Sequence, residues 1–257
     1  MTLYAEPRVV EDLAQCQFYH AMDLPGGVFV RGNWDLRNSF EKYTGNVDFA
    51  GRRVLEIGTA DGFLTFEAEK RGAEVVSFDS ASPTMHAGLP FIEVRRRGDG
   101  SDPEAVDDFQ GLRNGYWYAH RAYGSRAKCH YGDVYNLPDE LGEFDIVVSG
   151  AILCHLRDPL SALTSIARRC RSHLVITEAM VDSNTPLMVF LGDPRREVNK
   201  YSGWWNLSIA LYVNFLEILG FRTLFYVQND YPWQNTKGAK RDMRLGTLVA
   251  VRQEPVV

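Results

Sequence analysis

Two glycines and one carboxylate are spaced in a way that suits the binding of a ribose. Gly58 and Gly62 follow a short apolar run, and Asp79 comes about 20 residues after Gly58. Glycine lets a backbone turn sharply and approach a ligand without a Cβ in the way. A carboxylate offers two acceptor oxygens for two vicinal hydroxyl donors. The spacing therefore predicts a nucleoside site.

Further polar residues follow two other apolar runs. Gly132 and Asp133 end one run, and Ser149 and Gly150 end the next. His155 comes shortly afterwards, and histidine titrates in the range useful to a general base. His155 is either that base or a side chain that only packs and hydrogen-bonds in the loop, and both interpretations stay open.

Metal and redox chemistry have little support in the sequence. Glu178 and Asp182 could be a second base or metal ligands, but no convergent carboxylate cluster accompanies them, so no metal is predicted. The four cysteines are widely spaced without a Cys-x-x-Cys pair, which favours reduced thiols in a cytoplasmic protein.

Alternating strands and helices must position these residues. A β-rich run, the glycine loop, a helical stretch and a second run form one βαβ unit over residues 53–79. Further strands are predicted at residues 127–131, 144–149, 173–177, 222–228 and 245–252, with helices at 159–170 and 208–219.

The last two predicted strands define the fold class. Only a turn-rich linker around Tyr231 to Asn235 separates them, so they should pair antiparallel. We therefore predict an α/β fold, a Rossmann-like, mostly parallel seven-stranded sheet with a C-terminal antiparallel hairpin. Residues 1–45 would form an N-terminal cap segment and residues 46–257 the main domain, with insertions at about 81–126 and 181–205 that carry function or a lid.

The stretch Val54-Leu-Glu-Ile-Gly-Thr-Ala-Asp-Gly-Phe63 resembles motif I of the class I S-adenosylmethionine-dependent methyltransferases, acidic-x-Gly-x-Gly-x-Gly, with Ala60 in place of the middle glycine. The resemblance implies S-adenosylmethionine as cofactor. It assigns the methionine part to Glu56, Gly58 and Asp61, the ribose to Asp79, the adenine edge to residues 132–134 and the sulfonium to residues 149–151. The complete expected set is Glu56, Gly58, Thr59, Ala60, Asp61, Gly62, Phe63, Asp79, Ser80, Gly132, Asp133, Val134, Ser149, Gly150 and Ala151.

The stretch Val148-Ser-Gly-Ala-Ile-Leu-Cys-His-Leu-Arg-Asp-Pro-Leu160 looks like the enzymes that convert the tRNA wobble uridine to its 5-oxyacetic acid form. In that family a tyrosine precedes the histidine and helps to hold the carboxylate of carboxy-S-adenosylmethionine, whereas this chain has Cys154. Residues 81–126 are also longer than in such tRNA enzymes. The fold and the cofactor class are carried over, and ordinary methyl donation is expected.

The expected reaction is an in-line displacement that moves a methyl group to an oxygen or nitrogen of a small-molecule acceptor. The alternatives are a tRNA-modifying transferase, an NAD-dependent oxidoreductase and a silent cofactor-binding module. Each candidate for the acceptor pocket could instead pack in the core: Arg31, Trp34, Tyr116, Tyr118, His120, Trp204 and Trp205.

Composition limits the partners of the chain. A net charge of −5 over 257 residues disfavours a nucleic-acid partner, for which residues 95–97 and 237–244 are the best candidates. No apolar run reaches the roughly 20 residues needed to span a bilayer, and no secretory leader pattern is present. The oligomeric state is not predicted.

Overall fold

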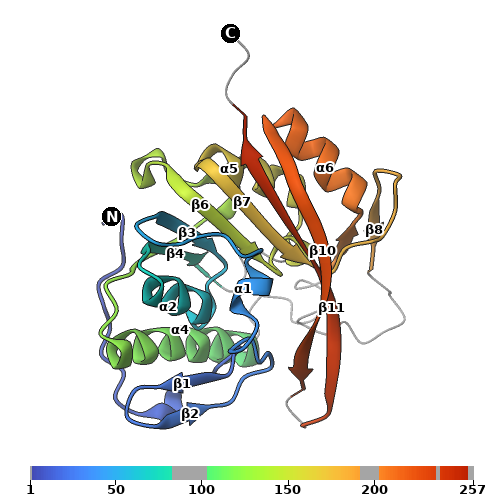
Figure 1. The fold of residues 1–257 in the computed structure, drawn as a ribbon. Helices are drawn as coiled ribbons and strands as arrows, with labels where there is room; N and C mark the ends of the chain where they lie inside the picture. Colours follow the sequence, from blue (N-terminus) through green and yellow to red (C-terminus); the bar gives the residue numbers. More distant parts are fainter. Residues whose placement is uncertain (1, 83–102, 192–202, 236–237, 254–257) are drawn as a thin grey trace.

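A seven-stranded sheet forms the centre of the protein, with helices on both faces (Figure 1). The structure, a computed structural model, describes residues 2–82, 103–191, 203–235 and 238–253. The strand order is β10-β11-β7-β6-β3-β4-β5. In the described ranges no helix has the length and apolar character needed to cross a bilayer.

Five parallel strands make up the core of the sheet: β3 (Arg53–Ile57), β4 (Glu74–Ser80), β5 (Lys128–Gly132), β6 (Phe144–Gly150) and β7 (Cys170–Glu178). The central strands β3 and β6 are mainly apolar, because both faces of each are covered. Successive residues point to opposite faces, so Val54 joins one buried cluster and Leu55 the other.

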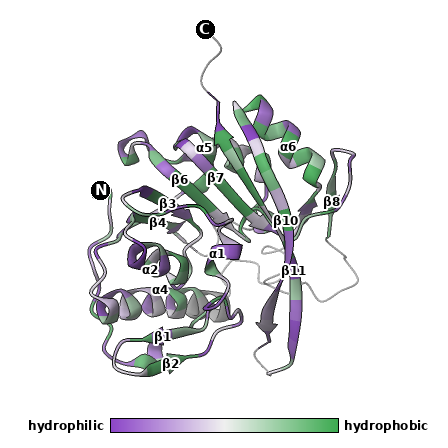
Figure 2. Cartoon of the chain, viewed as in Figure 1, coloured by the Kyte–Doolittle hydropathy of each residue, from purple (hydrophilic) through white to green (hydrophobic). Residues whose placement is uncertain are grey.

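The last two strands, β10 (Phe221–Gln234) and β11 (Lys240–Arg252), form a long antiparallel hairpin. Their antiparallel pairing is as expected, and β11 also runs antiparallel to β7. The expected turn-rich linker around Tyr231 is wrong, because β10 continues through Pro232. A proline is tolerated there because β10 is the edge strand. Figure 2 shows the outer half of this hairpin as mainly hydrophilic and the central strands as mainly hydrophobic.

Two pairs of helices cover the sheet. On one face lie α2 (Phe63–Lys70) and α4 (Pro103–Tyr123), and on the other α5 (Pro159–Arg168) and α6 (Ile209–Ile218). Residues 81–126, expected to be an insertion outside the skeleton, contain α4, which connects β4 to β5. This segment therefore supplies a crossover helix of the fold. Short 3₁₀ helices follow β5 and β6: η2 (Val134–Asn136), η3 (Asp139–Leu141) and η4 (Leu153–His155).

The N-terminal segment packs on the face covered by α2 and α4 (Figure 1). It contains η1 (Leu13–Gln15), the short pair β1 (Met22–Leu24) and β2 (Val28–Val30), and α1 (Phe40–Tyr43). Its Trp34 forms a β-bridge with Trp233 of β10. After β7, another small pair forms from β8 (Met188–Phe190) and β9 (Trp205–Leu207).

Candidate functional site

A pocket lies at the carboxyl ends of the parallel strands. This edge is where open α/β sheets bind ligands. The pocket brings together six of the residues predicted to bind the cofactor, and four apolar side chains complete it. Its lining consists of Ile57, Gly58, Phe78, Asp79, Ser80, Gly132, Asp133, Val134, Ile152 and Leu156.

The glycine loop has the backbone that its sequence requires. Gly58 and Gly62 adopt φ of +79° and +85°, in the left-handed region that favours glycine. Ala60 adopts φ of +51°, although a left-handed alanine costs about 1–2 kcal/mol. Its N–H donates to Asp79 Oδ2 over 2.9 Å, which fastens the loop to the end of β4. This strained alanine stands where the family pattern has its middle glycine.

The donors and acceptors of the pocket fit an adenosyl group. The Asp79 carboxylate is partly exposed on the pocket wall and accepts the N–H groups of Ala60 and Ser80. A carboxylate has about four acceptor positions, so it can also take ribose hydroxyls. Phe78, Val134 and Ile152 offer apolar surface to a planar base. Asp133 accepts the N–H of Tyr135 and starts η2 at the pocket rim.

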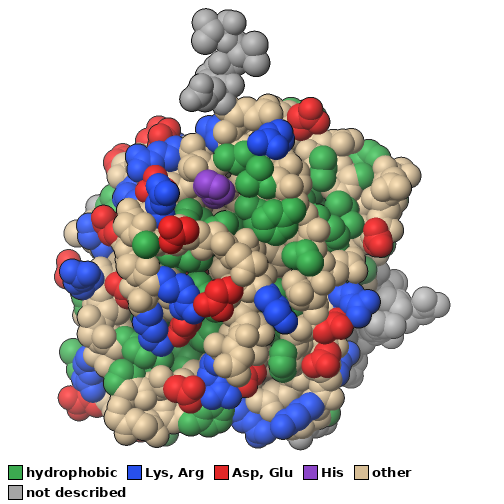
Figure 3. All heavy atoms as spheres, in the orientation of Figure 1, with side chains coloured by type: hydrophobic (Ala, Val, Ile, Leu, Met, Phe, Trp, Pro, Cys, Tyr) green, Lys and Arg blue, Asp and Glu red, His purple; other side chains and the backbone are tan. Residues whose placement is uncertain are grey.

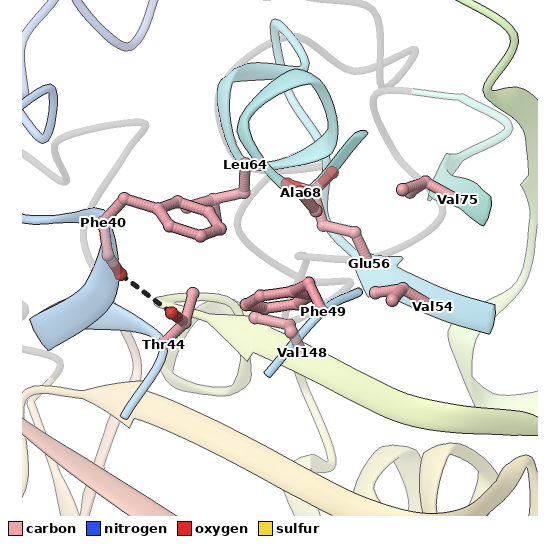
Figure 4. Close-up of a pocket in the computed structure, with 9 residues that line it drawn as sticks. All are labelled: Phe40, Thr44, Phe49, Val54, Glu56, Leu64, Ala68, Val75 and Val148. Carbon is pink, nitrogen blue, oxygen red and sulfur yellow. Dashed lines mark hydrogen bonds between the residues drawn. The ribbon is translucent and has the colours of Figure 1, made fainter. Parts of the chain in front are cut away.

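Glu56 does not line this pocket, and its expected contact with the methionine part stays a prediction. It is buried, and its carboxylate accepts the hydroxyls of Thr59, over 2.9 Å, and Thr65. Burial raises its pKa to about 7, and the two hydroxyls partly oppose that rise. Figure 4 shows Glu56 beside an interior cavity lined mainly by apolar side chains, among them Phe40 and Phe49. Glu56 thus stabilises the glycine loop through its hydrogen bond with Thr59.

Asp61 also has a different partner from the one expected. Its side chain is 0% exposed, and its Oδ2 accepts the backbone N–H groups of Tyr19 and His20 over 2.7 and 2.6 Å. Its Oδ1 lies 2.7 Å from His20 Nδ1. Asp61 therefore joins the glycine loop to the N-terminal segment, and its burial leaves it no surface for the methionine part.

The loop after β6 carries the residues expected beside the sulfonium. Ala151 adopts φ of +52°, and its N–H donates to Thr177 O over 2.7 Å. A Cβ on Gly150 would lie 2.7 Å from Tyr43 Oη, so the N-terminal segment closes directly over this loop. Ser149 Oγ is buried without a hydrogen-bond partner in the described ranges. His155 ends η4 and is partly buried.

Glu178 lies beneath the same loop at the end of β7. Its Oε1 accepts the N–H of Leu153 over 2.7 Å, whereas its buried Oε2 has no hydrogen-bond partner within the part of the chain that is described. Burial raises the pKa of Glu178 to about 7. Burial also raises the pKa of the neighbouring Cys154 thiol, and the nearby Glu178 carboxyl adds to that rise.

The two tryptophans expected in the acceptor pocket lie next to this loop. The backbone N–H of Trp204 donates to Cys154 O over 2.7 Å. The Trp204 ring stacks on Phe190 at 6.5 Å between ring centroids. Trp205, which begins β9, also packs against Phe190. Trp34 is buried in the N-terminal segment with Nε1 unpaired in the described ranges, and Arg31 is exposed.

Tyr116 and His120 were wrongly placed in the acceptor pocket, because both belong to the inner face of α4. Tyr116 is 0% exposed, and its hydroxyl lies 2.9 Å from Ser77 Oγ. His120 Nε2 lies 3.0 Å from Ala127 O. Tyr118 is partly buried against the same cluster. These aromatic side chains fix α4 to the sheet.

Sequence reasoning missed the residues that the N-terminal segment contributes: Tyr19, His20 and Tyr43. Their contacts join parts of the chain about 40 to 135 residues apart, and no local pattern marks them. It also missed Ile152 and Leu156. The apolar residues between Ala151 and Pro159 were the available sign of a pocket wall.

The basic residues considered for nucleic-acid binding are only partly described. Residues 95–97 and 236–237 lie outside the described ranges. On the hairpin, Arg244 forms an ion pair with Asp230 at 2.8 Å, and Arg241 lies over the Trp233 ring at 4.5 Å.

The sheet order, the antiparallel β11 and the carboxylate at the end of β4 together define a class I methyltransferase fold. The chain matches the family described as a methyltransferase domain over residues 35–212, and it belongs to that family. The match confirms the predicted class of enzyme and decides against an NAD-dependent oxidoreductase.

Among known proteins, a ubiquinone biosynthesis O-methyltransferase of Ruegeria sp. (strain TM1040) is 30% identical over 125 residues. This match covers 48% of the chain and only 39% of that relative.

Solved structures confirm the fold. Magnesium protoporphyrin IX methyltransferase of Synechocystis PCC 6803, with bound S-adenosylhomocysteine, superposes with a TM-score of 0.54 at 16% identity, covering 85% of this chain and 82% of that one. The N-terminal domain of EvdMO1, also with bound S-adenosylhomocysteine, gives a TM-score of 0.54 at 16% identity over 94% and 93% of the two chains.

Proposed function

We propose that this chain transfers the methyl group of S-adenosylmethionine to an oxygen or nitrogen of a small-molecule acceptor. The observation that carries the proposal is the pocket in which Gly58, Asp79 and Gly132 meet at the carboxyl edge of the sheet. The sulfonium of the bound cofactor would supply an activated methyl carbon. The task of the protein is then to hold the acceptor in line with it and to exclude water.

The residues at this edge would bind different parts of the cofactor. Asp79 would accept the ribose hydroxyls, residues 132–134 would border the adenine, and the loop at residues 149–151 would lie beside the sulfonium. We propose that residues 1–45 act as a cap that closes the acceptor side, since Tyr43 contacts Gly150 and Asp61 holds Tyr19. Trp204 and Trp205 would form the opposite wall.

Surface charge supports a small acceptor over a tRNA. On the face shown in Figure 3, basic and acidic side chains are interspersed, whereas a nucleic-acid site needs a basic surface. The Ruegeria relative is named for a ubiquinone-pathway reaction and the Synechocystis enzyme for a porphyrin. Cys154 leaves the loop without the tyrosine of the wobble-uridine enzymes, which supports an ordinary methyl donor.

Calorimetry with S-adenosylmethionine, S-adenosylhomocysteine and NAD tests the cofactor directly. We expect the first two to bind and NAD not to bind. The acceptor can be sought by supplying cofactor labelled in its methyl group to a panel of phenols, carboxylic acids and amines and following the label by mass spectrometry. A failure of both adenosyl ligands to bind would refute the proposal.

Asp79→Asn should weaken binding of S-adenosylhomocysteine about tenfold or more, because it removes a charged acceptor from the ribose site. The Asp139→Asn variant is a matched control, since Asp139 is an exposed residue of η3 outside the pocket. Equal affinities of the two variants would show that Asp79 does not hold the ribose.

A further inference from the structure

A buried histidine–aspartate pair joins the cap to the glycine loop. Asp61 Oδ1 lies 2.7 Å from His20 Nδ1, and Asp61 Oδ2 accepts the N–H of His20 itself over 2.6 Å. The His20 side chain is 9% exposed. A Cβ on Gly32 would collide with the backbone of His20, so the chain is built to pass closely at this point. The same carboxylate therefore fixes both the backbone and the ring of His20.

The orientation of the ring determines its chemistry. With Nδ1 facing a carboxylate, the neutral imidazole keeps its proton on Nδ1 and has a lone pair on Nε2. Nε2 has no hydrogen-bond partner among the residues that the structure describes. The ring stacks on Phe63 at 5.4 Å and meets Tyr19 edge-on at 5.0 Å, which restricts its rotation. A proton acceptor is thus held in a single orientation.

The position of His20 relates it to both loops of the site. Phe63 begins α2 directly after the glycine loop. The preceding residue, Tyr19, donates its backbone N–H to the same Asp61 carboxylate over 2.7 Å. His20 therefore lies beside the glycine loop, in the same N-terminal segment whose Tyr43 lies against Gly150 of the loop expected to face the sulfonium. His155 follows that second loop.

We propose that His20 is the proton acceptor in methyl transfer and that Asp61 is its positioning residue; this inference rests on the proposed function. The lone pair of the acceptor forms the bond to the methyl carbon, and the carbon–sulfur bond breaks with its electrons going to sulfur. The proton of the acceptor hydroxyl or amine moves to Nε2. The imidazolium is stabilised by Asp61 and later releases the proton to water.

The charge of the methyl donor allows a test that does not require the methyl acceptor to be known. S-adenosylmethionine carries a positive sulfonium and S-adenosylhomocysteine a neutral thioether. A unit charge about 10 Å away, at an effective dielectric constant of about 20, changes a protonation equilibrium roughly tenfold. Histidine-labelled protein is studied by NMR at one fixed pH with each ligand in turn. We expect the ratio of protonated to neutral His20 to be about tenfold lower with S-adenosylmethionine.

The ionisable groups facing His20 are Asp61, Tyr19 and Glu56. They are common to both complexes and cancel in the comparison. His173 is the internal control, because it lies in the first half of β7, away from the carboxyl edge. Asp61→Asn should move the proton of the neutral ring from Nδ1 to Nε2. An equal protonation ratio with the two ligands would overturn the proposal, whereas absence of binding would refute the proposed function instead.

A second measurement addresses turnover. On an acceptor found with the panel above, His20→Gln should lower kcat by about 10²–10⁴-fold while affinity for S-adenosylhomocysteine stays within a few-fold. An unchanged kcat would show that another group takes the proton. His155→Gln provides the comparison, and a larger loss in that variant would restore His155 as the base.

Discussion

At the scale of single residues, Gly62 is constrained both by its backbone conformation and by the side chains packed against it. Its φ of +85° disfavours any other residue, and a Cβ would lie 2.6 Å from Phe66 and 2.8 Å from Tyr116. Gly26 has nearly the same φ, +84°, but a Cβ there would meet nothing within 4 Å. The two positions share backbone strain and differ in packing.

Gly62→Ala should therefore lower the free energy of unfolding by about 3 kcal/mol or more, and Gly26→Ala by only about 1–2 kcal/mol. Urea unfolding followed by circular dichroism measures both values. Similar losses in the two variants would mean that Phe66 and Tyr116 move aside, so that the packing around the glycine loop is less rigid than the structure indicates.

At the scale of elements, α4 holds the cap through two glycines on one face. Gly111 and Gly115 are four residues apart, so both face the passing segment around Gln17. The Gln17 N–H donates to Gly111 O over 2.9 Å. The atoms nearest to a Cβ on Gly111 would belong to the side chain of Gln17, whereas a Cβ on Gly115 would collide with the backbone oxygen of Gln17.

Gly115→Ala should loosen the cap although alanine favours a helix by about 1 kcal/mol over glycine. The expected result is faster hydrogen exchange of the Tyr19 and His20 N–H groups, which the Asp61 carboxylate binds. Gly111→Ala is the matched control, because a flexible side chain can move away. Unchanged exchange in Gly115→Ala would show that the cap does not depend on this face.

The elements differ in how far the sequence could predict them. The central strands were predicted to within a few residues because a strand buried on both faces is apolar at successive positions, as residues 146–148 of β6 are. The length of β10 was not predicted, because Pro232 and its polar neighbours are typical of a turn. Only the edge position of β10 permits a strand there. The pocket glycines and Asp79 could be predicted from spacing, whereas the pairing of Asp61 with His20 depends on tertiary structure.

At the scale of the whole molecule, two buried carboxyls make stability depend on pH. The pKa of Glu56 and that of Glu178 are each raised from 4.5 to about 7 by burial. A raised pKa in the folded state means that the native protein binds more protons than the unfolded chain between these values. The resulting stability is complete below about pH 4.5 and is lost as the pH rises through 7.

Glu178→Gln should remove its share of this dependence, because the amide does not ionise. Between pH 4.5 and 8 the wild-type protein should lose about 3 kcal/mol more unfolding free energy than the variant. Denaturant unfolding over that range measures the difference, with Glu143→Gln, at an exposed residue, as control. Parallel curves for wild type and Glu178→Gln would mean that Glu178 is already ionised when folded.

The contact between the outer hairpin and the cap has a consequence for biosynthesis. Asn33 Nδ2 donates to Gln234 O, 201 residues further along, and the Asp35 N–H donates to Pro232 O. Because synthesis proceeds from the N-terminus, these two contacts can form only after Gln234 has emerged from the ribosome. Nascent chains should therefore be able to form β3 to β7 before Asn33 and Asp35 reach β10.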